Sequence, residues 1–353
     1  MRMLRERLAR LDIEVLPPFI GTDTVAILRG ARPGKNLTLR ADIDALRLDE
    51  KTGCAYASTH PGMMHACGHD AHMAMLMGAA EVLCSMKDRI KGTIRFVWQP
   101  GEENRAMAKP LIEAGALDEP PPAMVSAIHM LPGAPAGTVT VARGASDAAC
   151  AHFKITFRGK GGHGSRPFAA RNPLTAAAAA VIEAQGIVQN RLNPLHAGEV
   201  SISNLNSGDI DNLIPDEAVL GGTIRSFDTD DAATLATGLR EVCENAAKMH
   251  RVECDADIRQ TYLPVVNTPA ETEMALRTAE RAGLPTAILP EPLMSSEDFS
   301  YYLTRAPGVM IKLGNGEDSP ALHNSAFDAS DEAMRNGIRY FVELAKEFSA
   351  TRA

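Results

Sequence analysis

Residues 65–86 have the sequence HACGHDAHMAMLMGAAEVLCSM, and the fold can be worked out from this stretch. Its first eight residues hold three imidazoles, one thiol and one carboxylate. The residues after them are mostly apolar and recur at helical spacing, at Met75, Leu76, Ala79, Val82 and Leu83. This spacing predicts a helix from Ala71 to Met86. Imidazoles and a thiol clustered at its start favour a metal site over simple burial.

Three further segments, far apart in the sequence, carry side chains that can bind a metal. Glu102 and Glu103 follow an apolar run and a Gln-Pro-Gly turn. His129 ends a second apolar run, and His323 lies near the end of the chain. One such segment would be weak support for a site. Four of them indicate a metal centre that the fold assembles.

Short β-rich runs on either side of the first stretch define the fold class. Residues 37–41, 92–98 and 124–128 are apolar, rich in β-formers and bounded by polar or turn residues, which predicts buried strands. Strands that alternate with helices predict an α/β fold with a mixed, mainly parallel sheet. Residues at the strand ends then lie beyond the carboxyl edge, where ligands usually bind in such sheets.

The middle of the chain follows a different pattern. Strands are predicted at residues 151–157, 200–204, 218–227 and 252–258, with helices at residues 173–189 and 230–250. The order β-α-β-β-α-β is the ferredoxin-like arrangement of an α+β domain. We therefore expect residues 148–260 to form a domain inserted into a discontinuous catalytic domain of residues 1–147 and 261–353.

Composition excludes several classes of protein. The chain has 353 residues, enough for two domains, with 45% hydrophobic and 23% charged residues. Its net charge of -8 argues against a nucleic-acid partner. The six cysteines form no CxxC pair, which favours a reducing cytoplasm. We expect no membrane association, since no apolar run is long enough to span one and the first residues lack the apolar core of a signal peptide.

Eight motifs, in order over nearly the whole chain, resemble those of the M20 metallopeptidase family. The resemblance is to its amidohydrolase branch, which includes aminoacylase-like, hippurate-hydrolase-like and auxin-conjugate-hydrolase-like enzymes. The matching stretches are Leu39-Arg-Ala-Asp-Ile-Asp-Ala-Leu46, Met64-His-Ala-Cys-Gly-His-Asp70, Gln99-Pro-Gly-Glu-Glu103, Gly159-Lys-Gly-Gly-His163, Asn212-Leu-Ile-Pro-Asp216, Gly222-Thr-Ile-Arg-Ser-Phe227, Ser296-Glu-Asp-Phe299 and Leu322-His-Asn324. Together they are highly specific, although no single one is.

The resemblance implies a zinc-peptidase-like catalytic domain with two divalent metal ions. The implied ligands are Cys67, His69, Glu103, His129 and His323. Five side chains suffice for two ions if some bridge and water or substrate completes the coordination. A thiolate among them favours zinc, manganese, cobalt or nickel over magnesium or calcium. The family resemblance favours zinc or manganese, and the sequence does not distinguish the two.

The resemblance also assigns roles to two further carboxylates. Glu102 would be the general acid/base, which takes a proton from a metal-bound water as it attacks and delivers it to the leaving amine. Asp44 matches a carboxylate that orients a metal-binding group. His65, Asp70 and His72 are either outer contacts of the ligands or ordinary residues of the helix start.

A second group of candidates lies on the expected inserted domain. His163 stands in a Gly-Gly-His-Gly turn, where its imidazole could donate to a developing oxyanion. Arg225 offers a bidentate donor and Asn212 an amide, which together suit a substrate carboxylate. In related enzymes such a histidine reaches the active site of the neighbouring subunit. The resemblance therefore implies a homodimer, or a larger homo-oligomer, through a lid/dimerisation domain.

These assignments predict a cytoplasmic amidohydrolase that acts on linear amides. Its substrate would be a small N-acyl amino acid, such as an acetyl or benzoyl conjugate, cleaved to a carboxylate and a free amino acid. The alternatives are a dipeptidase or carboxypeptidase of the same family, a hydrolase that uses Cys67 as nucleophile, and a metal-binding homologue without catalysis.

The chain departs from its relatives in a few places. It begins after a helix with a His-x-x-Pro-Glu-like motif that the family usually has, so we expect an amino-terminal truncation or a late start codon. Arg47 replaces a usual proline, Phe168 a common histidine, and Asn172 an acidic residue. The last two predict different substrate contacts near the hinge of the inserted domain.

Overall fold

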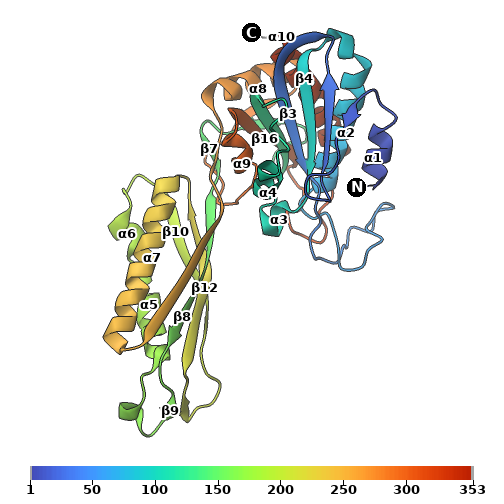
Figure 1. The fold of residues 1–353 in the computed structure, drawn as a ribbon. Helices are drawn as coiled ribbons and strands as arrows, with labels where there is room; N and C mark the ends of the chain where they lie inside the picture. The colour runs from blue at the N-terminus through green and yellow to red at the C-terminus, as the bar shows by residue number, and fades with distance from the viewer. Residues whose placement is uncertain (1, 351–353) are drawn as a thin grey trace. The chain divides into compact units, whose positions relative to one another are not determined.

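A computed structural model describes residues 2–350, and the chain divides into two compact units (Figure 1). The larger unit comprises the chain up to Ser146, Val265–Pro292 and the chain from Asp298 onward. The smaller unit comprises Asp147–Pro264 and the short segment Leu293–Glu297. That segment belongs with the smaller unit because the Ala148 N–H donates to the carbonyls of Leu293 and Ser295.

The larger unit is built on an eight-stranded sheet in the order β1-β2-β4-β3-β5-β16-β6-β15. The four strands β4, β3, β5 and β16 in its middle run parallel, and antiparallel pairing occurs only toward the two edges. Its strands are β1 (Glu14–Val15), β2 (Thr24–Arg29), β3 (Arg32–Asp42), β4 (Lys91–Gln99), β5 (Met124–Pro132), β6 (Val139–Val141), β15 (Thr286–Ile288) and β16 (Gly308–Gly316). The predicted mixed, mainly parallel sheet is confirmed, as are its three predicted strands.

Helices cover both faces of this sheet. Leu39 and Trp98 pack on one face with α2, α8 and α10, while Val97 and Val125 pack on the other with α4 and α9. The alternation of Val97 and Trp98 between the two cores follows from the period of two in a strand. The helices are α1 (Arg2–Leu8), α2 (His69–Ser85), α3 (Glu102–Arg105), α4 (Ala108–Glu113), α8 (Pro269–Arg281), α9 (Ser300–Leu303) and α10 (Asp331–Ala350), with a 3₁₀ turn at Lys87–Arg89.

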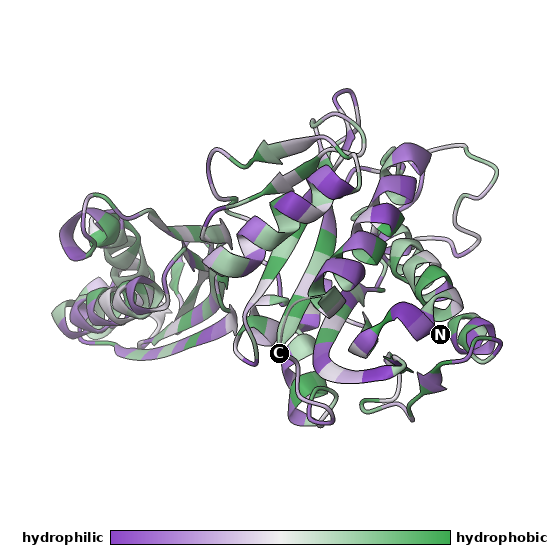
Figure 2. Cartoon of the chain, turned by 90° about the horizontal axis from the view of Figure 1, so that it is seen from above, coloured by the Kyte–Doolittle hydropathy of each residue, from purple (hydrophilic) through white to green (hydrophobic). Residues whose placement is uncertain are grey.

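Figure 2 shows the resulting distribution of hydropathy, with hydrophobic strands inside and helices that are hydrophilic on their outer sides. The helix predicted from Ala71 to Met86 is confirmed as α2, which begins two residues earlier, at His69. Among residues 2–350, no helix is long and apolar enough to cross a membrane.

The smaller unit has a four-stranded antiparallel sheet in the order β10-β12-β8-β13, packed against α5 and α7. Its β-α-β-β-α-β chain order and this strand order are ferredoxin-like, as predicted. Its elements are β8 (Ala149–Arg158), β9 (Gly162–His163), a 3₁₀ turn at Pro167–Ala169, α5 (Pro173–Ala184), α6 (Ile187–Arg191), β10 (Gly198–Asn206), β11 (Leu213–Ile214), β12 (Glu217–Ser226), α7 (Thr229–His250) and β13 (Glu253–Tyr262). Two short strands outside the main sheets, β7 (Ala145–Asp147) and β14 (Val265–Val266), pair with each other.

The helix predicted at residues 173–189 is interrupted, which corrects the sequence-based prediction. α5 ends at Ala184 and the separate helix α6 starts at Ile187. Around Gly186 the backbone bonds tighten to the i→i−3 type, from Gln185 to Ile182 and from Gly186 to Glu183. Glycine has a low helix propensity, so the helix yields at this residue. At the other end Asn172 caps α5, since its side chain accepts a hydrogen bond from the Leu174 N–H.

Candidate metal centre

The predicted ligand residues of the larger unit meet at the carboxyl edge of its sheet. The start of α2 supplies Cys67 and His69, the end of β5 supplies His129, and the loop after β16 supplies His323. Ligand atoms of Cys67, His69 and His129 lie within 4.8 Å of one another, and those of Cys67, Glu103 and His323 do likewise. Five residues from four segments are thus brought together, in two groups that share the thiol.

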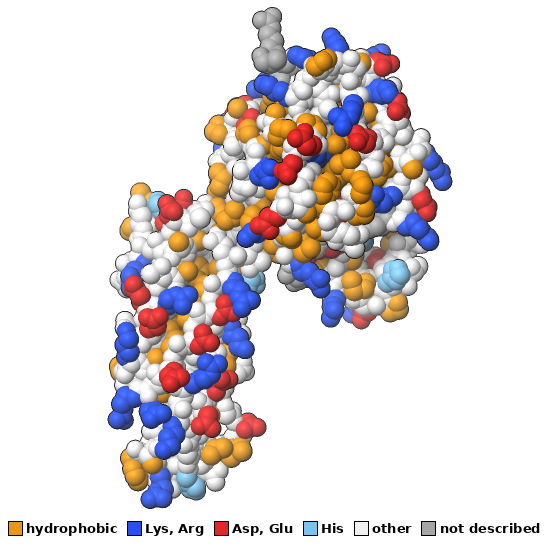
Figure 3. All heavy atoms as spheres, in the orientation of Figure 1, with side chains coloured by type: hydrophobic (Ala, Val, Ile, Leu, Met, Phe, Trp, Pro, Cys, Tyr) orange, Lys and Arg blue, Asp and Glu red, His pale blue; other side chains and the backbone are white. Residues whose placement is uncertain are grey.

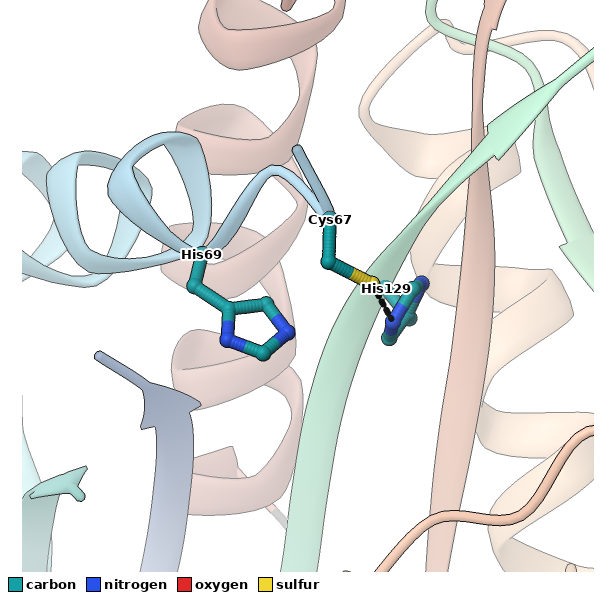
Figure 4. A group of neighbouring side chains, drawn as sticks. All are labelled: Cys67, His69 and His129. Carbon is teal, nitrogen blue, oxygen red and sulfur yellow. Dashed lines mark hydrogen bonds between the residues drawn. The ribbon is translucent and has the colours of Figure 1, made fainter. Parts of the chain in front are cut away.

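A left-handed glycine allows this approach at the start of α2. Gly68 has φ of 79°, a conformation that side chains disfavour. A Cβ at this position would lie 2.9 Å from Met130 Cγ, so the strand that carries His129 leaves no room for one. Figure 4 shows the result: Cys67 and His69 project from either side of this turn, and Cys67 points at His129.

Hydrogen bonds fix which nitrogen each histidine offers. The Nδ1 of His69 lies 3.0 Å from the carbonyl oxygen of Asp44, and the Nδ1 of His129 lies 2.9 Å from that of Met130. Because a carbonyl can only accept, both Nδ1 atoms carry a proton, so the neutral form of each ring offers its Nε2 to a metal. The Nε2 of His129 lies 3.6 Å from Cys67 Sγ (Figure 4). The Nε2 of His69 is buried and has no hydrogen-bond partner in the part of the chain that the structure describes, as expected of a metal ligand.

Asp44 positions both glutamates at once. Its two carboxylate oxygens accept from the Glu102 and Glu103 N–H groups, at 3.0 and 3.1 Å. Burial raises the pKa of Asp44, but the hydrogen bond and charge of His69 and the two N–H groups outweigh it and lower the pKa. Glu102 is buried, with an exposed fraction of 5%. One of its carboxylate oxygens lies within 4.8 Å of ligand atoms of His69 and Glu103.

His323 is held in a strained backbone conformation. Its φ is 62°, which non-glycine residues rarely adopt and which costs about 1–3 kcal/mol. Its N–H donates to the Ala66 carbonyl at 2.7 Å, and its Nε2 lies 3.1 Å from Glu103 Oε1. The strained backbone conformation therefore places the His323 imidazole at the cluster.

The electrostatics of the cluster suit a cation. Burial lowers the pKa of His69, but the neighbouring carboxylates, Asp42 first, outweigh it and raise the pKa to about 9. Burial raises the pKa of the Cys67 thiol, and nearby Glu103 and Asp42 raise it further. Burial and then the Lys312 charge lower the pKa of His129, which keeps that ring neutral. Excess negative charge, a neutral imidazole and a thiol are a donor set that fits a divalent transition metal.

A buried charged network behind the cluster was missed from the sequence. Arg40 binds Asp42 and Asp298, each at 2.7 Å, and all three side chains are at most 1% exposed. Gln99 also donates to Asp298. His72 joins the network: its Nε2 accepts from the Met130 N–H at 2.9 Å, so its Nδ1 carries the proton and donates to Asp42 at 2.6 Å.

The sequence did contain a signal for this network. Arg40 is a charged residue inside an otherwise apolar strand, and such a residue is buried only with partners. Of the three outer candidates, His72 is thereby tied to the strand that carries His129. The Asp70 carboxylate accepts from the Ala71 N–H, and His65 Nδ1 has no hydrogen-bond partner among the described residues.

The candidates on the smaller unit do not form one group within the chain. His163 and Asn212 lie together, since Leu213 pairs with His163 and the Gly164 N–H donates to the Asn212 carbonyl. This pair lies beyond one end of the four-stranded sheet, the end at which Glu217 of β12 pairs with Arg158 of β8. Arg225 lies eight residues along β12 from Glu217, about 26 Å at the usual rise per residue. Arg225 and Asn212 of one chain are therefore too far apart to bind the same small carboxylate.

Comparisons with known proteins agree with the geometry of the larger unit. Residues 38–347 match the description Peptidase family M20/M25/M40. The chain belongs to this M20 family. An N-acetyldiaminopimelate deacetylase of Streptococcus uberis is 36% identical over 90% of this chain and 84% of its own length. Thermostable carboxypeptidase 1 of Saccharolobus solfataricus is 34% identical over 99% of this chain and 90% of its own.

A solved M20 structure shows the same fold. The YXEP protein of Bacillus subtilis, described as a dinuclear metal binding peptidase, superposes with a TM-score of 0.85 at 31% identity. The match covers 98% of this chain and 90% of the other. The recognition of the family from eight motifs is confirmed, and so is the fold of the larger unit.

Proposed function

We propose that this M20 protein is a dinuclear metal-dependent amidohydrolase that cleaves N-acyl amino acids to a carboxylate and a free amino acid. The observation that carries the proposal is the pair of overlapping ligand groups. One consists of Cys67, His69 and His129, the other of Cys67, Glu103 and His323. These five residues are the predicted ligands, and together they would hold the two ions. Similarity to a deacetylase of an N-acetylated amino acid supports the substrate class.

In this mechanism the chain's own residues orient the reactants and move the proton. The bound ions supply Lewis acidity toward the amide carbonyl and water. Glu102 takes the proton of the attacking water and delivers it to the nitrogen of the leaving amine. Asp44 keeps that carboxylate in place through the N–H groups of Glu102 and Glu103. Adjacent residues thus divide the work, with Glu103 on the metal side and Glu102 on the proton side.

The smaller unit supplies the remaining contacts. Arg225 binds the substrate carboxylate, and His163 and Asn212 reach the site of a partner chain in a homodimer, His163 to donate to the oxyanion and Asn212 to the carboxylate. The distance between Arg225 and the His163–Asn212 pair along one chain supports this sharing, since no small substrate spans about 26 Å. All six cysteines are free thiols, which supports a cytoplasmic location.

A chelation and reconstitution assay tests the function. Purified protein should carry close to two transition-metal equivalents per chain, lose activity in chelator and regain it with zinc or manganese, with cobalt and nickel as further trials. A panel of N-acetyl and N-benzoyl amino acids should be hydrolysed. Active protein without metal would contradict the proposal.

The same assay separates two alternatives. Similarity to a carboxypeptidase favours a peptidase as the second candidate, which would prefer dipeptides with a free amino terminus. A hydrolase with Cys67 as nucleophile would work in chelator and accumulate an acyl-enzyme visible by mass spectrometry. If the protein bound metal but hydrolysed neither the N-acyl amino acids nor the dipeptides, it would be a metal-binding protein without catalysis.

A further inference from the structure

Arg225 is held by a short segment that returns to the smaller unit late in the chain. Its Nη1 donates to the Ser296 hydroxyl at 3.0 Å and to the Met294 carbonyl. Both acceptors lie on Leu293–Glu297, which follows Arg225 by nearly seventy positions in the sequence. One terminal nitrogen of the guanidinium is therefore fully used inside the protein.

The segment has its own anchors and does not depend on Arg225. The Ala148 N–H donates to the carbonyl of Leu293 at 3.1 Å and to that of Ser295 at 2.8 Å. The Ser295 hydroxyl donates to Asp147 at 2.8 Å. Ser296 thus presents its hydroxyl from a fixed backbone, and the guanidinium adjusts to it.

The rest of the guanidinium forms no ion pair among the described residues. Among residues 2–350, no carboxylate lies within ion-pair distance of Arg225, and its Nε and Nη2 have no hydrogen-bond acceptor. Its register partners across the sheet are Cys150 on β8 and Glu199 on β10, and the Glu199 carboxylate forms no ion pair with it. Burial raises the pKa of the Cys150 thiol, while the Arg225 charge and a hydrogen bond with Ser296 act in the opposite direction.

An arginine can bind a carboxylate through two hydrogen bonds in two ways, end-on with Nη1 and Nη2 or side-on with Nε and Nη2. Because Nη1 is already bound, only the side-on edge remains. We propose that Ser296 is the positioning residue that selects this edge, so that Nε and Nη2 of Arg225 take the two oxygens of the substrate carboxylate. The inference rests on the proposed function and adds to it a determinant of specificity for N-acyl amino acids with a free carboxylate.

Kinetics with an N-acetyl amino acid and its C-terminal amide test the proposal on the metal-loaded protein. Ser296→Ala should raise KM for the acid by about fivefold, the usual effect of one hydrogen bond, and leave kcat within twofold. Rates on the amide should not change. Ser296→Thr keeps the hydroxyl and should restore KM, and Ser296→Cys removes the strong acceptor at similar volume. Ser203→Ala, which removes a hydroxyl that donates to the Gly221 carbonyl in the smaller unit, is the matched control.

A double-mutant cycle decides whether Ser296 acts through Arg225. In the Arg225→Ala background, Ser296→Ala should have no further effect on KM for the acid. An equal effect in both backgrounds, or unchanged KM in both Ser296→Ala and Ser296→Cys, would overturn the inference. If the wild type hydrolysed the acid and the amide equally well, this result would contradict the carboxylate site of the proposed function itself. Discrimination between acid and amide that neither Ser296→Ala nor Ser296→Cys reduces would overturn the positioning role alone.

Discussion

The two units place their candidate residues in opposite environments. In the larger unit Asp42, His69 and Asp298 are buried and bound to one another or to common partners. In the smaller unit His163 and Asn212 are exposed, and the core is made of alanines and other apolar side chains. On the face shown in Figure 3, positive and negative side chains are interspersed over the smaller unit.

This contrast teaches where chemistry and folding are coupled. A buried charge is tolerated only with its partners, so the larger unit cannot lose one without a penalty in stability. Exposed residues away from such networks change stability little. Substitutions in the buried charged network of the larger unit should therefore affect folding, metal content and rate together, whereas those of exposed residues in the smaller unit should affect rate alone.

The largest expected effect is that of Glu102→Gln, which tests whether rate can be separated from metal in the larger unit. Turnover should fall by roughly two to four powers of ten, the scale for loss of a general base, while metal content stays at the wild-type level. Stopped assays and elemental analysis on the same sample measure both. Glu103→Ala is the control and should lose metal as well as rate. Near-native turnover of Glu102→Gln would refute the assignment of the base.

Asp298→Asn addresses the coupling to stability directly. It replaces one of the two carboxylates that balance the buried Arg40 charge with a neutral amide, so the free energy of unfolding should fall by about 3–5 kcal/mol. Asn212→Ala in the smaller unit should change it by no more than about 0.5 kcal/mol. Urea unfolding of the metal-free proteins gives both values. Equal effects of the two substitutions would remove the contrast between the units.

Arg225→Ala should weaken the action on free acids while sparing the fold. Loss of the charge-assisted pair should cost about 2–5 kcal/mol in kcat/KM for an N-acyl amino acid. The corresponding amide, already a poor substrate of the wild type, should be hydrolysed at an unchanged rate. A variant that lost both activities equally would point to a structural role of Arg225.

The smallest effect, a partial recovery, tests whether the smaller unit serves a second chain. Glu102→Ala and His163→Ala should each be nearly inactive as homodimers. Mixed equally, dissociated and reassociated, they should regain about a quarter of the wild-type sites, because about half the dimers are mixed and each of these has one complete site. Light scattering and mass spectrometry verify the mixed dimers. No recovery in verified mixed dimers would mean that His163 acts within its own chain or not at all.

The sequence predicted the larger unit well because its elements have strong local signals. α2 has the period of a helix buried along one side, and β4 and β5 are the apolar runs of buried strands. The family resemblance then implied the five ligand candidates. The Arg40–Asp42–Asp298 network could not be predicted in the same way. Its members are separated by up to 258 positions, and only the packing of β3 against the loop before α9 brings them together.

In the smaller unit the prediction worked for the elements and was incomplete for the site. Alternation along β8 and β12 predicted the sheet, but periodicity gives no distance between residues at its two ends. His163, Asn212 and Arg225 were grouped by function, and the register of β12 separates them. The contact of Arg225 with Ser296 could not be predicted from the sequence either. It depends on a segment of only five residues, Leu293–Glu297, that belongs to the smaller unit while the residues on both sides of it belong to the larger one.

The length of the smaller unit's sheet has a consequence for how the protein behaves on dilution. If one complete site needs Arg225 from one chain and His163 from another, the active species is a pair, and its amount varies with the square of the free-chain concentration. Specific activity should then be constant at high protein concentration and fall below the dissociation constant of the pair. Enzyme levels in the cell would set not only how many sites exist but also what fraction of them is complete.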